Sequence, residues 1–176
     1  MGSVTIRRPG EKEYAQFHAA YVALVPDGDV LALLEKQGKD TQALLRPLSE
    51  ETSQFRYAAG KWSIREVVGH MTDAERVFTY RALHFARGDK NPLPGFDETV
   101  WGATTAAHQR SFVSLLDDLQ AVRAATLALF RGFNEAEVGR SGVASGATTT
   151  VRALAYVAAG HERHHIQVLK ERYLSR

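Results

Sequence analysis

The sequence predicts an all-α fold, an antiparallel four-helix bundle with a short extra N-terminal helix and a long crossover loop. Apolar residues recur every three or four positions over four long segments, and glycine- and proline-containing segments separate them. No segment shows the alternation of a half-buried strand, and no internal repeat is present. A chain of 176 residues can bury one substantial core without cross-links.

We expect two parts in the chain, an N-terminal segment (residues 1–28) and the bundle domain (residues 29–176). In the first part, aromatic and apolar residues at helical spacing predict a short helix over residues 11–25. A Pro-Asp-Gly sequence at residues 26–28 ends this helix, because proline and glycine break helical structure.

Residues that cap helix N-termini mark the first two long helices. Asp29 is placed to cap a helix over residues 30–48. Ser63 and Glu66 have the spacing of a capping box, in which each side chain binds the other residue's backbone N–H, and they predict a helix over residues 64–87.

The remaining elements follow from the same patterns of apolar spacing and of glycine and proline. They are a connector over residues 49–62, a crossover over 89–105 with a helical turn at 97–101, a helix over 106–133, a loop over 134–146, and a last helix over 148–174 capped by Thr148 or Thr149.

Composition excludes several classes of function. The net charge is +2, from 22 basic and 20 acidic residues, and no block of five like charges is present, which argues against nucleic acid or a membrane surface as a partner. No apolar run approaches the roughly 18 residues of a membrane span, and the N-terminus lacks the apolar core of a signal peptide. We therefore expect a cytoplasmic protein with neither nucleic acid nor a membrane as its partner.

The last predicted helix carries an unusual group of histidines. His161 and His165 are four residues apart, so on a helix they lie about 40° apart and one turn above one another. They occupy the apolar stripe, where a bundle helix normally places leucine or isoleucine. His70 falls on the edge of the apolar face of the helix over residues 64–87 and is the natural third ligand for a metal. His164 could also take part.

Two interpretations of these histidines stay open from spacing alone. A buried histidine is more often a hydrogen-bonded core residue than a metal ligand. A catalytic site of the zinc type, however, needs three protein ligands and an open coordination position. Because the chain has no cysteine, His, Asp or Glu must bind any transition metal.

Residues 161–165 also spell HExxH, the pattern of zinc proteases in which the glutamate is the general base. A protease would need a further ligand after this motif, and the eleven residues that follow His165 contain no His or Asp. A protease is therefore disfavoured, but Glu162 could still relay protons in another reaction.

The motifs resemble those of the DinB-like superfamily, a group of DinB/YfiT-type metal-dependent enzymes. The segments that carry the resemblance are GKWSIREVVGHMTDAER (60–76), YRA (80–82), ARGD (86–89), PLPGFD (92–97) and GHERHHIQVLK (160–170). The resemblance runs from about Asp29 to the end of the chain. It implies a four-helix bundle, one divalent metal ion, commonly zinc or nickel, and frequently a homodimer. The family's ligand positions match His70, His161 and His165.

Three functions follow from the resemblance. The first is a transferase that joins a low-molecular-weight thiol to a small electrophile, with a link to stress or damage. The second is a hydrolase of small amides or esters, in which Glu162 or a neighbouring carboxylate relays protons. The third is a metal-binding stress protein without catalysis. Arg76, Arg81 and Arg163 could bind a substrate carboxylate, although an exposed helix position is the simpler interpretation of each.

Overall fold

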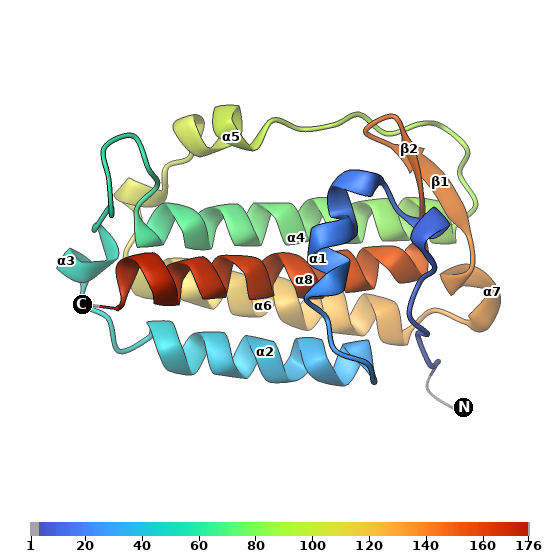
Figure 1. Ribbon diagram of the computed structural model, residues 1–176, viewed down its shortest axis with the longest axis horizontal. Coiled ribbons are helices and arrows are strands. Elements are labelled where there is room, and N and C mark those ends of the chain that lie inside the picture. The colour runs from blue at the N-terminus through green and yellow to red at the C-terminus, as the bar shows by residue number, and fades with distance from the viewer. Residues whose placement is uncertain (1–3, 176) are drawn as a thin grey trace.

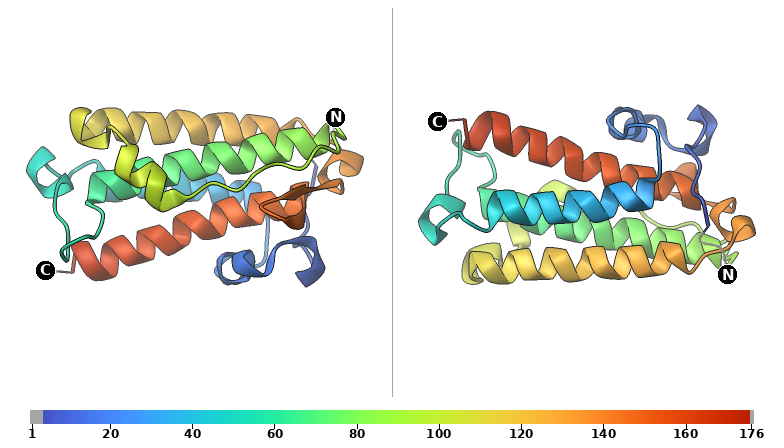
Figure 2. Two further views of the ribbon diagram at one scale, coloured as in Figure 1. Left: turned by 90° about the horizontal axis from the view of Figure 1, so that it is seen from above. Right: turned by 90° about the horizontal axis from the view of Figure 1, so that it is seen from below.

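The computed structural model describes residues 4–175 and contains four long helices that pack lengthwise (Figure 1, Figure 2). Their bounds are α2 Val30–Leu45, α4 Ile64–Ala86, α6 Phe112–Arg131 and α8 Val151–Val168. A π-helical turn, Leu169–Tyr173, continues α8. The predicted four-helix bundle is present, and α4 packs against both α6 and α8.

The long helices do not simply alternate in direction. α4 and α6 run the same way, whereas α2 and α8 run the opposite way (Figure 1). The segment between α4 and α6 causes this arrangement, because it passes back along the outside of α4 before α6 begins. The prediction of a purely antiparallel bundle is corrected accordingly: α4–α8 and α2–α6 are antiparallel pairs, and α4–α6 and α2–α8 are parallel pairs.

The predicted caps of α2 and α4 are confirmed. The Asp29 carboxylate accepts hydrogen bonds from the backbone N–H groups of Leu31 and Ala32. Ser63 and Glu66 form the complete capping box at the start of α4. Each cap satisfies backbone donors that have no partner inside the helix, so the starts of these helices follow from local sequence.

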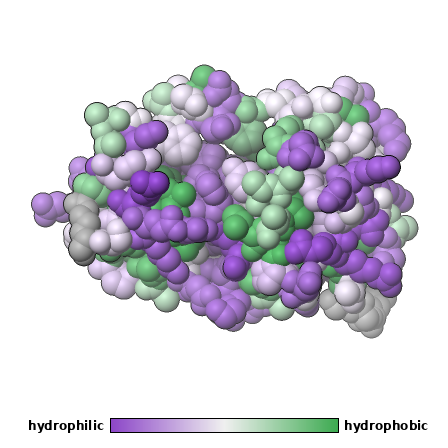
Figure 3. Space-filling view, in the orientation of Figure 1, coloured by the Kyte–Doolittle hydropathy of each residue, from purple (hydrophilic) through white to green (hydrophobic). Residues whose placement is uncertain are grey.

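The N-terminal segment is less regular than predicted. Only α1, Ala19–Ala23, is α-helical; two 3-10 turns, Glu11–Glu13 and Gln16–His18, precede it. Tyr14 has an extended backbone and separates the two turns. A helix this short has little stability of its own, so packing decides its form. α1 crosses α8, and hydrophobic side chains gather over this crossing (Figure 3).

A β-hairpin replaces part of the predicted loop and the start of the last helix. Strands β1 (Ser141–Ala144) and β2 (Ala147–Thr150) pair antiparallel, so the prediction of an all-α chain is wrong here. Thr150, and not Thr148 or Thr149, caps α8. Consecutive threonines favour a strand because their branched side chains suit a pleated surface. The short helix α7, Glu135–Val138, precedes the hairpin.

The connecting segments contain short helices. α3, Glu50–Ser53, lies in the connector before α4, and α5, Glu98–Thr104, lies in the crossover where one helical turn was predicted. A 3-10 turn, Ala107–Gln109, and then Ser111 as N-cap precede α6, which begins later than predicted. α5 packs against α4 and contains no buried residue.

The hydrophobic core consists of two clusters, one toward each end of the bundle. Between them, every long helix carries polar side chains that are buried or half-buried. We call this group the polar layer; it contains Gln37 and Thr41 of α2, His70 and Glu75 of α4, Arg123 of α6, and His161, Glu162 and His165 of α8. The candidate site lies within this layer.

Candidate metal centre

The structure brings the three predicted ligands together. His70 of α4 and His161 of α8 point their Nε2 atoms at one another, 3.0 Å apart. The Nε2 atom of His165 lies 3.1 Å from that of His161. One ligand atom from each of the three residues falls within 4.8 Å of those of the others. Two distant parts of the chain therefore present three imidazole nitrogens to a common point.

These separations suit a single metal ion. With metal–nitrogen distances of about 2.05 Å, two ligands of a tetrahedral ion lie about 3.3 Å apart, and two ligands at a right angle lie about 2.9 Å apart. The observed separations of 3.0 and 3.1 Å fall between these values. Three imidazoles are also a usual donor set for zinc and nickel. The donor atoms present thus fit a divalent transition metal.

Burial keeps these imidazoles neutral, as metal ligands must be. Burial lowers the pKa of His70 to about 4, against an opposing effect of the Glu98 carboxylate. Burial, with repulsion from His70 and His164, lowers the pKa of His165 to about 3. Burial and then the neighbouring histidines lower the pKa of His161 well below its usual value. At neutral pH, each ring therefore carries a nitrogen lone pair that can bind a metal.

Aromatic rings surround the three imidazoles. The Tyr21 ring meets His161 edge-on at a centroid distance of 5.3 Å, and the Phe78 ring does so at 5.5 Å. Trp62 lies against His70, with ring centroids 4.8 Å apart. Gly160 allows Tyr21 to approach, because a Cβ there would lie 1.9 Å from the Tyr21 carbonyl oxygen. These rings fix the imidazoles and limit the access of water.

A small cavity of about 10 Å³ opens beside His70, between α4 and α5. Its walls are Glu66, His70, Asp73, Phe96, Trp101, Gly102 and Thr105. α5 can come this close because residue 102 is glycine; a Cβ there would lie 2.8 Å from the Trp62 indole. The three-histidine cluster is therefore covered from this side by the crossover segment.

The structure does not bring Glu162 to the cluster. Its carboxylate accepts hydrogen bonds from Gln37 Nε2 at 2.7 Å and Thr41 Oγ1 at 2.8 Å, and it pairs with Arg123 Nη1 at 3.0 Å. Arg123 also binds both carboxylate oxygens of Glu75. The physical reason is helix rotation, because consecutive residues point about 100° apart. Glu162 thus belongs to the ion-pair side of the polar layer.

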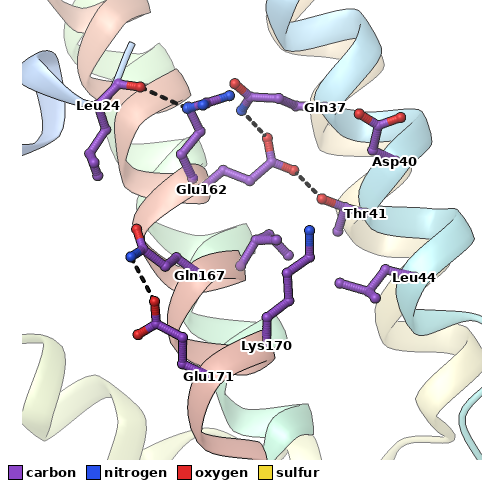
Figure 4. A pocket seen from close by; sticks show the side chains of 11 residues that line it. Leu24, Gln37, Asp40, Thr41, Leu44, Glu162, Gln167, Lys170 and Glu171 are labelled. Carbon is purple, nitrogen blue, oxygen red and sulfur yellow. Dashed lines mark hydrogen bonds between the residues drawn. The ribbon is translucent and has the colours of Figure 1, made fainter. Parts of the chain in front are cut away.

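A larger cavity, of about 470 Å³, lies on this other side of α8. It separates α2 from the C-terminal half of α8, and Glu162, Gln37 and Thr41 form part of its wall. Figure 4 shows Gln37 and Thr41 pointing at the Glu162 carboxylate, while Lys170 reaches toward them. This cavity does not contain any of the three clustered histidines in its lining.

Two residues that sequence reasoning did not assign to the site are close to it. Tyr21 belongs to the predicted N-terminal helix, to which no role at the site was assigned, but its ring contacts those of His161 and His164. Glu98 lies at the start of α5, and its charge opposes the lowering of the pKa of His70. Burial and then Glu98 raise the pKa of Tyr21. No local motif marks either residue, because both reach the site through the packing of irregular segments.

The family model described as the DinB superfamily matches residues 33–169. The chain belongs to the DinB superfamily. The resemblance in the histidine-bearing motifs is thereby confirmed at the level of the family. Among curated proteins, a sequence comparison finds no significant match.

Two solved structures of low sequence identity share the fold of this DinB-superfamily chain. The first is YfiT from Bacillus subtilis, which is described as a probable metal-dependent hydrolase with an unusual four-helix bundle topology. Its sequence is 18% identical to this chain, and the two structures align with a TM-score of 0.71 over 93% of this chain and 89% of that chain. A mycothiol-dependent maleylpyruvate isomerase is 14% identical with a TM-score of 0.62, over 82% of this chain and 61% of that chain. At such identities, the likeness establishes the bundle fold alone.

Proposed function

We propose that this chain is a metal-dependent transferase that joins a low-molecular-weight thiol to small electrophilic substrates. His70, His161 and His165 would hold one divalent ion, zinc or nickel. The observation that carries the proposal is the convergence of three neutral, largely buried Nε2 atoms at separations of 3.0 and 3.1 Å. The mycothiol-dependent enzyme among the structural neighbours supports the use of a thiol.

The positions of the carboxylates favour a thiol over water as the nucleophile. When bound, the ion supplies a Lewis acid that lowers the pKa of a thiol from about 8.5, or that of water from about 15.7, so that a thiol is deprotonated outright. Water has the higher starting pKa and depends more on a base nearby. Among residues 4–175, no carboxylate hydrogen-bonds to the three imidazoles, and Glu162 is turned away from them.

Glu98 and Tyr21 are the residues we assign to proton handling. The Glu98 carboxylate, whose charge acts on both His70 and Tyr21, would receive the proton that the thiol releases. The raised pKa of Tyr21 keeps its hydroxyl protonated, so it can donate a hydrogen bond to negative charge that develops on the substrate. Trp62 and Phe78 would exclude bulk water from the same space.

Hydrolysis of small amides or esters is the second candidate. YfiT is described as a probable metal-dependent hydrolase, and Glu98 could act as the base toward water. In that case Glu98 would take the role that the HExxH pattern assigns to Glu162.

The first experiment measures metal content in the purified protein and in the variants His70→Ala, His161→Ala and His165→Ala. We expect close to one equivalent of metal in the wild type and a loss in each variant, whereas the exposed control His108→Ala should retain it. Retention of metal in all three variants would refute the site.

The second experiment incubates metal-loaded protein with small thiols and a chromogenic electrophile, and separately with esters and amides. Metal-dependent consumption of thiol supports the transferase, and turnover in the second panel alone supports the hydrolase. Metal binding without turnover in either panel would instead support a non-catalytic metal-binding stress protein.

Assembly and cellular location stay predictions. We expect a homodimer, as the family resemblance implies, and a cytoplasmic enzyme. Sedimentation of the metal-loaded protein at several concentrations would test the first expectation. Within residues 4–175, none of the helices combines the length and the apolar character needed to cross a membrane.

A further inference from the structure

Among residues 4–175, three arginines are almost completely buried, and one of them lacks a counter-ion there. Arg65 and Arg123 are each 4% exposed and pair with carboxylates, Arg65 with Glu50 and Arg123 with Glu75 and Glu162. Arg81 is only 3% exposed, so the expectation of an exposed position is wrong for this residue. Within residues 4–175, no carboxylate lies within ion-pair distance of it.

The hydrogen bonds of Arg81 leave part of its guanidinium unused. Its Nη2 donates to the Pro94 carbonyl oxygen and to Ser145 Oγ, both at 3.0 Å, and both acceptors are neutral. Its Nε and Nη1 have no partner within the described chain. Burial lowers the pKa of Arg81 with no carboxylate to offset it. A buried charge without a counter-ion is costly, by several kcal/mol in typical proteins.

A second unpartnered group lies close to Arg81. His18 is 6% exposed, and its buried Nδ1 has no hydrogen-bond partner in the part of the chain that the structure describes. Burial and then the positive charge of Arg81 lower the pKa of His18 to about 4, so the ring is neutral and can donate one N–H. In the tautomer that carries its proton on Nδ1, His18 adds a second donor that lacks an acceptor among residues 4–175, and an anion would satisfy both donors.

These donors lie on the same side of the fold as the three-histidine cluster. Arg81 follows His70 by eleven residues on α4, which places both on one helix face about 16 Å apart along the axis. Helical side chains lean toward the N-terminus, so Arg81 leans toward His70. Phe78 lies between the two regions, because its ring centroid is 6.1 Å from that of His18 and 5.5 Å from that of His161.

Phe96 separates Arg81 from the cavity beside His70. Its ring lies 5.9 Å from the Arg81 guanidinium carbon, and it also lines that cavity. Its ring also lies against that of Trp101 of α5, tilted by 40°, and Trp101 is 43% exposed. A shift of the half-buried Phe96 ring would join the cavity to the free side of Arg81, and an anion would then replace the weaker cation–π contact.

We propose that Arg81, assisted by His18, binds the carboxylate of an acidic small-molecule substrate whose reactive carbon lies at the three-histidine cluster. Arg81 is then a specificity-determining residue, and the electrophiles that fit carry a carboxylate several bonds from the reacting atom. This inference rests on the proposed function for the reaction, but binding of the carboxylate does not require turnover.

The chain provides its own reporter for this binding, because Trp101 lines the cavity and Trp62, the other tryptophan, packs against His70 and Gly102 in its wall. Zinc-loaded protein is titrated with glutarate and with its neutral diamide while tryptophan fluorescence is followed. We expect saturable binding of glutarate at least tenfold tighter than that of the diamide. Equal binding of the two compounds would overturn the proposal.

Variants locate the binding site. Arg81→Met should weaken glutarate binding at least tenfold without loss of zinc, whereas Arg76→Met should bind like the wild type, because Arg76 is exposed and pairs with Asp118. Ser145→Ala removes one neutral acceptor of Arg81 but keeps the charge, so it separates loss of the contact from loss of the cation. Binding that survives in Arg81→Met, or that is lost equally in Ser145→Ala, refutes the role of the charge.

Turnover distinguishes this inference from the proposed function. With Arg81→Met, the KM for a carboxylate-bearing electrophile should rise at least tenfold, while turnover of a neutral electrophile should stay within about twofold of the wild type. If the wild type transforms no electrophile but binds glutarate through Arg81, the proposed reaction fails and the carboxylate site stands. If it transforms both electrophiles equally well in both proteins, the reaction stands and the carboxylate site fails.

Discussion

Replacing Glu162 should damage stability and leave the chemistry in place. In Glu162→Ala, the carboxylate that accepts hydrogen bonds from Gln37 and Thr41 and pairs with Arg123 is lost. Bonds to charged groups are worth about 1.5–3 kcal/mol each, and breaking a buried pair typically costs about 3–5 kcal/mol. Arg123 retains its two bonds to Glu75, so no isolated charge remains. We therefore expect a loss of about 3 kcal/mol.

Urea unfolding of the metal-loaded proteins measures this loss, which corresponds to a Tm lower by roughly 10 °C for a chain of this size. Glu171→Ala is the matched control, because Glu171 is exposed and its carboxylate bonds only to Gln167 within the described chain. Its effect on the free energy of unfolding should stay below about 0.5 kcal/mol. Glu162→Gln, assayed at 25 °C, should keep turnover within about twofold. A drop of about a hundredfold or more in Glu162→Gln, with unchanged stability and metal content, would show that Glu162 is a general base and refute the reasoning.

Three further predictions concern pH, metal and helix packing. The pKa values of His18 and His70, about 4, and of His165, about 3, lie below the ordinary 6.5 in the folded state. Because the unfolded chain then binds protons more readily, the metal-free protein should lose stability as pH falls from 6.5 toward 4. Unchanged urea midpoints at pH 7 and 4.5 would contradict this. Zinc at a hundred times its Kd should stabilise the protein by about 2.7 kcal/mol, and a chelator should reverse the shift; a Tm indifferent to both would argue against binding to the folded state. Gly160→Ala should displace α1 and destabilise by at least about 2 kcal/mol, whereas Gly69→Ala, whose Cβ would lie 3.8 Å from its nearest neighbours, should be neutral or stabilising; equal effects in thermal unfolding would refute the packing argument.

The parts of the fold that sequence predicts are those set by local chemistry. Asp29 and Ser63 cap their helices with groups two or three residues away, and this spacing can be read without knowing the fold. The convergence of His70 on His161 was also predictable, because both lie on the apolar side of a long helix and bundle helices bury that side.

The parts that sequence does not predict depend on neighbours across the fold. The same helix rotation that turns His161 toward α4 turns Glu162 away, but only the structure shows that Gln37 and Arg123 receive it. Arg81 is buried because the crossover and the hairpin tip cover it through Pro94 and Ser145, and no pattern within α4 indicates that cover. The direction of α6 likewise depends on the path of the crossover (Figure 1).

The polar layer divides the hydrophobic core, so the middle of the bundle is held by polar contacts and not by apolar packing. Each end of the bundle has its own hydrophobic cluster. The helices between them are held together by imidazoles on one side of α8 and by the ion pair of Glu162 with Arg123 on the other. A cation bound by the three imidazoles would cross-link α4 to α8 within the polar layer. Removal of the ion should destabilise the polar layer first and let the two ends of the bundle move more independently. Metal binding and the rigidity of the whole bundle should therefore increase and decrease together.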